Sequence, residues 1–174
     1  MKEKSHVKYY IFAILALIFL VALDQWTKIL ATTHLMEEPL VLLTDVFELR
    51  YLENRGSAFG MLQNQRVLLL VVSMGVMVIS ALYFAKLPWN NKMSTLRILI
   101  VFIVAGGLGN MIDRIRLGYV IDFFYFKLIN FPIFNVADIY VTVSIILLFI
   151  LILFFFKEEE LDDFILFRKK NSNE

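Results

Sequence analysis

The stretch from Gly106 to Asp138, GGLGNMIDRIRLGYVIDFFYFKLINFPIFNVAD, leaves one strongly apolar segment and enters another. It carries three carboxylates, Asp113, Asp122 and Asp138, close to where two predicted membrane helices meet the water. A carboxylate at hydrocarbon depth costs roughly 2.5 to 3.5 kcal/mol on insertion scales and is usually kept for a partner or a reaction. We therefore take this stretch as the one around which the chain is organised.

The composition is that of a membrane protein. Of the 174 residues, 60% are hydrophobic and only 19% are charged, and the mean hydropathy is +0.74, unlike a soluble domain. A run of about 20 apolar residues can cross a hydrocarbon core of about 30 Å. We expect four such helices, at about residues 9–31, 67–85, 96–112 and 136–156. They leave no room for a second globular domain, so residues 1–174 are predicted to form a single membrane-embedded domain.

Several classes of function are excluded by residue content. A net charge of +1 without a long basic run argues against nucleic acid as a partner. There is no cysteine, which excludes disulfides, thiolate metal sites and cysteine nucleophiles. The only histidines, His6 and His34, are far in sequence from the acidic stretch, which argues against a histidine zinc site or a Ser-His-Asp triad. Carboxylates remain for acid-base work, and we expect no metal and no cofactor.

The distribution of basic residues predicts the orientation. The first apolar run follows three lysines as in a signal peptide, but it is longer than usual and lacks a convincing cleavage site, so we expect a retained helix. With the amino terminus inside, the inner segments hold ten lysines and arginines and the outer loops six. Both termini, including a charged amphipathic tail at residues 157–174, are therefore predicted to be cytoplasmic, with the acids near the outer face.

The outer loop between the first two helices, about residues 33–65, is predicted to contain a small hairpin. Leu40–Leu43 are apolar, Thr44-Asp45 is a plausible turn, and apolar and charged residues alternate from Phe47 to Tyr51. Asn54-Arg55-Gly56 then marks a turn towards the second helix. The expected fold is thus an all-α polytopic membrane protein of four transmembrane helices with a small extracytoplasmic antiparallel β-element.

Two further patterns concern the outer ends of the helices. Asp24 and Lys28, late in the first helix, are spaced i, i+4 on one face and can form a structural ion pair. Gly106, Gly107 and Gly109 allow close packing of the third helix with its neighbours. Both patterns predict a tightly packed outer end of the bundle.

The three acids of the central stretch have different predicted environments. Asp113 lies at the carboxyl end of a helix, opposes its dipole, and is expected to pair with an arginine such as Arg114. Asp122 lies in an aromatic loop where desolvation should raise its pKa. Asn135 and Asp138 have the spacing of N-cap and N3 at a helix start. Two carboxyl groups in different environments can divide one acid-base cycle between them.

Two other functions are compatible with such acids. Intramembrane acids also mark small transporters and proton relays, but a pathway needs polar groups through the depth of the bilayer, whereas here the acids cluster at one end. A structural membrane assembly factor is the second alternative, in which Asp138 only helps to start a helix. An uptake assay set against a peptide-cleavage assay separates these possibilities.

Five motifs, in order, resemble those of the lipoprotein signal peptidases, also called signal peptidase II. They are residues 24–28, DQWTK, similar to the family's DQxTK; 54–60, NRGSAFG, to NxGxAFG; 109–114, GNMIDR, to GNxxDR; 118–123, GYVIDF, to GxVxDF; and 131–138, FPIFNVAD, to FPxFNxAD. One departure is Ser144, where the family commonly has glycine. Serine is small enough to preserve close helix packing.

The resemblance implies an aspartic endopeptidase of the bacterial cytoplasmic membrane, with its active site near the outer face and a small sheet that cradles the substrate. Such enzymes remove the signal peptide of a diacylglyceryl-modified prolipoprotein just before the lipidated cysteine. The implied partners are that prolipoprotein and membrane lipids, and a monomer is expected. The implied catalytic dyad is Asp122 and Asp138. The implied supporting residues are Asp24, Lys28, Asn54, Gly56, Asn110, Asp113, Arg114 and Asn135.

Overall fold

The structure is a computed structural model that describes residues 3–57 and 61–156. Its helices are α1 (Glu3–His34), α2 (Arg66–Lys86), α3 (Asn91–Arg116) and α4 (Val136–Phe154), and its strands are β1 (Leu40–Leu43), β2 (Phe47–Asn54) and β3 (Val120–Tyr125). A short 3-10 helix, η2 (Lys127–Ile129), follows β3. Four of the described helices are long and apolar enough to cross a membrane, so the predicted multi-pass fold class is confirmed. The predicted tail at 157–174 lies outside the described residues.

The first three helices are longer than the apolar runs that predicted them, whereas α4, expected at 136–156, ends at Phe154. The third helix, expected at 96–112, begins at Asn91 and continues to Arg116. An apolar run measures only the part of a helix that lies in hydrocarbon, whereas the backbone stays helical where polar side chains reach water. Asn90 caps the start of α3 by accepting a hydrogen bond from the Met93 N–H at 2.8 Å. The extra turn at the other end carries Asp113 and Arg114.

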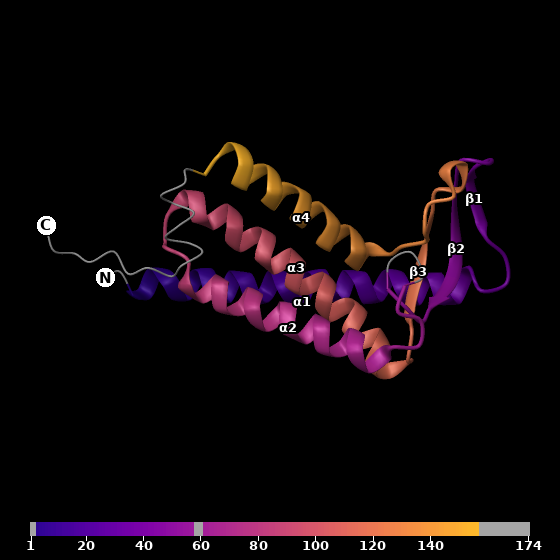
Figure 1. Cartoon of the computed structure of the whole chain (residues 1–174), viewed down its shortest axis with the longest axis horizontal. Coiled ribbons are helices and arrows are strands. Elements are labelled where there is room, and N and C mark those ends of the chain that lie inside the picture. Colours follow the sequence, from indigo (N-terminus) through magenta and orange to yellow (C-terminus); the bar gives the residue numbers. More distant parts are fainter. Residues whose placement is uncertain (1–2, 58–60, 157–174) are drawn as a thin grey trace, which may run out of the picture.

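α3 is the central helix and contacts each of the other three (Figure 1). The half of α3 nearer the sheet can approach them closely because its glycines have no Cβ: a Cβ at Gly106 would strike the Ala137 carbonyl of α4. A Cβ at Gly109 would meet the Asp24 carboxylate of α1. The predicted close packing at this end of the bundle is therefore confirmed.

The sheet has the order β1-β2-β3, with both pairings antiparallel. The predicted hairpin is confirmed, and Asp45 at its turn has a φ of 58°. The prediction that Asp122 lies in an aromatic loop is wrong, because Asp122 lies in strand β3. The segment lacks a polar and apolar alternation because both of its faces are covered: Ile121 and Phe123 pack near the end of α1, while Phe124 faces other aromatic rings.

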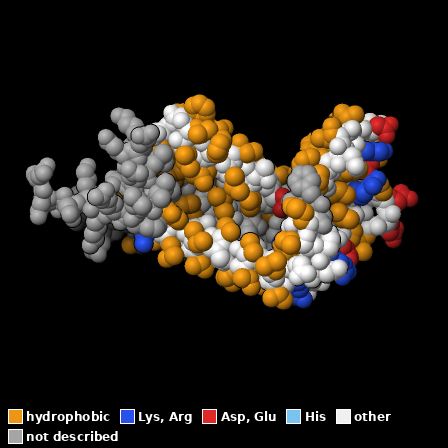
Figure 2. Space-filling model, in the orientation of Figure 1, with side chains coloured by type: hydrophobic (Ala, Val, Ile, Leu, Met, Phe, Trp, Pro, Cys, Tyr) orange, Lys and Arg blue, Asp and Glu red, His pale blue; other side chains and the backbone are white. Residues whose placement is uncertain are grey.

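The sheet stands across the end of the bundle where α1 ends and α4 begins, and β2 and β3 run across the helix axes (Figure 1). Apolar side chains cover the visible face of the helices, whereas most of the visible charged side chains gather around the sheet (Figure 2). This distribution suits a helical body in lipid and a sheet at the aqueous boundary. The predicted orientation of the termini stays a prediction.

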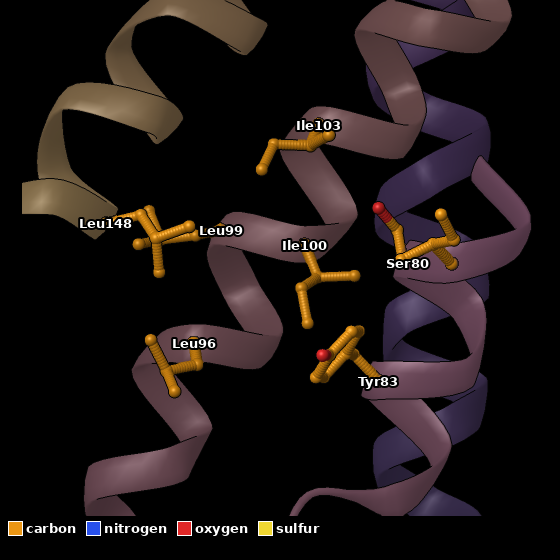
Figure 3. Close-up of a pocket in the computed structure, with 8 residues that line it drawn as sticks. Ser80, Tyr83, Leu96, Leu99, Ile100, Ile103 and Leu148 are labelled. Atoms are coloured by element: carbon orange, nitrogen blue, oxygen red, sulfur yellow. The ribbon is translucent and has the colours of Figure 1, made fainter. Parts of the chain in front are cut away.

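An apolar cavity of about 190 Å³ lies between α2, α3 and α4. Its lining includes Ser80 and Tyr83 of α2, Leu99 and Ile100 of α3, and Leu148 of α4 (Figure 3). None of the residues singled out from the sequence lines it. The acidic residues predicted to carry the chemistry lie elsewhere.

Candidate active site

Two of the acids lie on either side of one asparagine. Asp122 comes from β3 and Asp138 from the first turn of α4. Between them, the Asn135 side chain donates from Nδ2 to Asp122 Oδ1 at 2.6 Å and accepts at Oδ1 from the Asp138 N–H at 3.0 Å. Asn135 is fully buried and Asp122 is 1% exposed. The structure thus brings the two sequence-predicted catalytic residues together around one buried asparagine, with Asp122 buried and Asp138 half-buried.

The start of α4 holds Asp138 in place. Asn135 is the N-cap, and the Asp138 carboxylate reaches back to accept from the Asn135 backbone N–H at 3.1 Å, which completes a capping box. This confirms the predicted cap. The carboxylate lies at the positive end of the helix dipole, a position that favours a negative charge.

Asp122 has a different environment. Its Oδ2 accepts from Asn54 Nδ2 at 2.8 Å, while its Oδ1 accepts from Asn135. Burial in the first place, and the nearby Asp138 in the second, raise the pKa of Asp122 to about 7. These two causes outweigh the two amide hydrogen bonds, which favour the ionised form. Asp122 is therefore suited to hold a proton near neutral pH, as its sequence environment predicted.

Asn110 of α3 connects Asp138 to a buried lysine. Its Nδ2 donates to Asp138 Oδ1 at 2.8 Å. Its Oδ1 accepts from Lys28 Nζ at 2.9 Å and from Asn135 Nδ2 at 3.1 Å. The amide is thus fixed by partners on both of its ends.

Lys28 forms two buried ion pairs. Its Nζ lies 3.0 Å from Asp24 Oδ2 and 2.9 Å from Asp113 Oδ2. The predicted pair of Asp24 and Lys28 is confirmed. The expected pairing of Asp113 with Arg114 is wrong, because consecutive helical residues do not face each other and Asp113 turns towards α1. Its carboxylate also accepts from the Ile121 N–H of β3 at 3.2 Å.

Arg114 of α3 contacts the turn after β2, in which Gly56 lies. The Arg114 guanidinium donates to the Gly56 carbonyl at 2.9 Å, and the Gly56 N–H donates to Asn54 Oδ1 at 2.9 Å. Asn54 in turn donates to Asp122. All ten residues singled out from the sequence therefore join one hydrogen-bonded network. Residues 58–60 of the same motif lie outside the described residues.

Gln25 is a member of the network that sequence reasoning missed. Its Nε2 donates to Asp113 Oδ1 at 2.9 Å and to the Gly109 carbonyl at 3.2 Å. Its position beside Asp24 in an apolar helix was the available signal, because an amide at membrane depth needs a partner.

Comparison with known proteins identifies the family. The family profile described as signal peptidase (SPase) II matches residues 16–154. A lipoprotein signal peptidase of Streptococcus thermophilus is 40% identical over 133 residues, covering 76% of this chain and 86% of the relative. One from Streptococcus pyogenes serotype M5 is 41% identical over 135 residues, covering 77% and 88%.

A solved structure agrees with these sequence matches. A bacterial membrane enzyme determined by the in meso method at 2.3 Å resolution superposes with a TM-score of 0.72 and 29% identity, covering 93% of this chain and 94% of that one. A second such structure, at 1.9 Å, has the same TM-score and 30% identity. Sequence profile, relatives and fold agree over most of the chain, and the protein therefore belongs to the signal peptidase II family of membrane proteases.

Proposed function

We propose that this peptidase cleaves diacylglyceryl-modified prolipoproteins just before the lipidated cysteine, with Asp122 and Asp138 as an aspartic acid-base dyad. Membership of the family makes removal of signal peptides from prolipoproteins its function. The observation that supports the aspartic mechanism is the pair of carboxyl groups, Asp122 buried and Asp138 half-buried, held in different environments on either side of Asn135. Such a pair can activate water without a nucleophilic side chain or a metal.

The two environments suggest how the work is divided. Asp138, at the start of α4, acts as the initial base and takes a proton from water, which attacks the scissile carbonyl carbon. Asp122, whose pKa is raised to about 7, acts as the initial acid and donates its proton to the carbonyl oxygen. Collapse of the tetrahedral intermediate breaks the C–N bond: the proton held on Asp138 goes to the leaving amine, and one hydroxyl of the intermediate returns its proton to Asp122 as the carbonyl re-forms. The two titrations belong to the pair rather than to either residue.

The position of the dyad supports a substrate that arrives through the membrane. Asp122 and Asp138 lie where the sheet meets the bundle, between the apolar helices and the charged end of the molecule (Figures 1 and 2). The excess of basic residues in the two termini and the link between α2 and α3 supports an outer position for this end. A lipidated precursor could therefore keep its acyl chains and signal helix in the bilayer while its cleavage site lies at the dyad.

The transporter alternative is supported less well. The network of polar groups lies at one end of the bundle, and no charged residue lies between Arg66 and Lys86 in α2. A conduction pathway needs polar groups through the bilayer depth. An uptake assay with the reconstituted protein is expected to show no transport beyond that of empty vesicles.

The test is the mass of the product. Purified protein incubated with a diacylglyceryl-modified prolipoprotein should release a lipoprotein that begins with the lipidated cysteine. Mass spectrometry identifies the bond that was cut. An unshifted mass under several detergent conditions would contradict the proposal, and a cut elsewhere would contradict the assigned cleavage position.

A further inference from the structure

We propose that Lys28 of α1 is a positioning residue that fixes both carboxylates of the dyad; the proposal rests on the function proposed above. Lys28 is 1% exposed. Its ammonium group has three N–H donors, and three partners accept from it: Asp24 at 3.0 Å, Asp113 at 2.9 Å and Asn110 at 2.9 Å. No donor is left for a substrate, so Lys28 acts through its neighbours.

The first connection runs through Asn110. An ammonium group donates and never accepts, so the Asn110 oxygen has to face Lys28. The amide nitrogen then faces Asp138, to which it donates at 2.8 Å. With the amide reversed, its oxygen would face a carboxylate and its nitrogen an ammonium, and both contacts would be repulsive. Lys28 therefore decides that Asp138 receives a hydrogen-bond donor.

The second and third connections run through the two acids. Asp24 accepts from the backbone N–H of Ala137 at 3.0 Å, and Ala137 immediately precedes Asp138. Asp113 accepts from the backbone N–H of Ile121 at 3.2 Å, and Ile121 immediately precedes Asp122. The same ammonium group thus ties together the two carboxylates that hold the backbone beside each catalytic aspartate.

The charges of Asp24 and Asp113 explain why a cation, the Lys28 ammonium group, is needed between them. Asp24 and Asp113 are both buried, and without the ammonium group each would be an unpaired charge near another of the same sign. Breaking a buried pair by removing one partner is strongly destabilising. A displacement of a reacting group by about 1 Å can lower the rate roughly 10²-fold. Holding Asp24 and Asp113 at a fixed separation therefore affects the rate of the reaction as well as the stability of the fold.

The experiment has to separate this role from a purely structural one. Lys28→Met removes the ammonium group. Lys28→Met combined with Asp113→Asn removes one charge of each sign, so the three residues Asp24, Lys28 and Asp113 keep the same net charge. Lys8→Met, an exposed position on the same helix, is the matched control. Wild type and Asp122→Asn are assayed beside them on the lipidated precursor, after folding is checked by monodispersity and thermal unfolding.

The folded double variant is expected to keep a KM close to the wild-type value while kcat falls about 10²-fold, because an interaction that acts only on the dyad affects the transition state. Lys8→Met should match wild type. Adding Asn110→Ala to the double variant should cost little more, because residues that act as a unit are not additive. Lys28→Arg, which keeps the charge and the donors, should recover part of kcat.

Several results would overturn the proposal. A folded double variant with wild-type kcat would show that the dyad needs no positioning by Lys28. Failure of every Lys28 variant to fold would assign the residue to the fold alone. In both cases, cleavage by wild type and its loss in Asp122→Asn would leave the proposed function standing. Absence of cleavage by wild type itself would reject the proposed function and this inference together.

Discussion

At the scale of single residues, three asparagines decide how the carboxylates are held. The oxygen of each one accepts from a fixed donor: the Gly56 N–H for Asn54, the Asp138 N–H for Asn135, and Lys28 for Asn110. Their amide nitrogens therefore point at the two aspartates. Orientation of these donors before substrate arrives avoids a reorganisation cost during the reaction.

Replacing either dyad aspartate should abolish measurable turnover. Asp122→Asn and Asp138→Asn each preserve shape but remove the proton exchange that activates water. The double variant should be hardly worse than either single one, since the two act as a unit. Initial rates on the lipidated precursor, measured for folded and monodisperse protein, check this prediction.

Asp45→Asn serves as the matched control for these variants. Asp45 is an exposed aspartate in the β1–β2 turn that pairs with Lys127 at 2.9 Å, and its substitution should leave turnover unchanged. Near-normal turnover in a folded Asp122→Asn or Asp138→Asn variant would exclude that residue from catalysis.

The pH dependence of activity should report the dyad. The pKa of Asp122 is raised from 3.8 to about 7 by burial and by Asp138, so its proton is lost as the pH rises through about 7. We expect kcat/KM to fall along an alkaline limb centred near that pH, because the acid form is needed at the start of the cycle. A value of kcat/KM that stays constant from roughly pH 6 to roughly pH 9 would argue against Asp122 as the acid.

The same shift predicts an effect on stability. Because the pKa of Asp122 is raised on folding, the folded protein binds more protons than the unfolded one between about pH 4 and pH 7, and stability falls as the pH rises through this range. Asp122→Asn removes the ionisable group and with it this loss of stability at high pH. Its melting temperature should exceed that of wild type at pH 8, with a smaller difference at pH 4. Thermal unfolding in one detergent at both pH values decides the matter.

At the scale of elements, residues of two helices, α1 and α4, supply the hydrogen-bond acceptors for the first turn of α4. Its first turn has backbone N–H groups that need acceptors. The N–H of Asp138 is capped within α4 by Asn135, whereas the N–H of Ala137 is capped by Asp24 of α1. Asp138 on this turn is therefore placed by the packing of α1 against α4 as well as by its own helix.

The turn after β2 gives an element-scale prediction. Gly56 is held on both sides, by Asn54 at its N–H and by Arg114 at its carbonyl, and an added Cβ would lie 2.5 Å from the Met61 carbonyl oxygen. Gly56→Val should therefore move Asn54, a donor to Asp122, and reduce kcat more than it reduces folding. Rates and melting temperatures of the purified variant measure the two effects.

Gly75 of α2 supplies the control, because nothing lies within 4 Å of an added Cβ there. Gly75→Val should leave the rate unchanged. Equal rates in Gly56→Val and Gly75→Val would mean that the turn after β2 does not position the dyad.

At the scale of the whole molecule, the arrangement predicts dependence on lipid. β3 and the start of α4, which carry the proposed dyad, lie where the apolar helical body meets the sheet and its charged side chains (Figures 1 and 2). Acyl chains in the bilayer can therefore supply binding energy that positions the scissile bond. An unlipidated precursor should be cut much more slowly than its diacylglyceryl form. Matched time courses by gel or mass spectrometry test this, and equal rates on both forms would count against it.

The sequence by itself determined the features that depend on neighbours along the chain. Apolar runs predicted the four spans, alternation and a turn predicted the β1–β2 hairpin, and fixed spacing predicted the Asn135 cap and the pair of Asp24 with Lys28. Each of these lies within one element or between adjacent elements. Periodicity and i, i+4 spacing are properties of the local backbone, so the sequence carries them.

Only the tertiary structure decided which partners meet from distant parts of the chain. β3 is a strand because β2 pairs with it, Asp113 turns to Lys28 rather than to Arg114, and Gln25 reaches across to α3. These contacts depend on the direction in which each side chain leaves its helix and on how closely the glycines let α3 approach its neighbours. Local spacing does not contain that information, and the packing of the bundle supplies it.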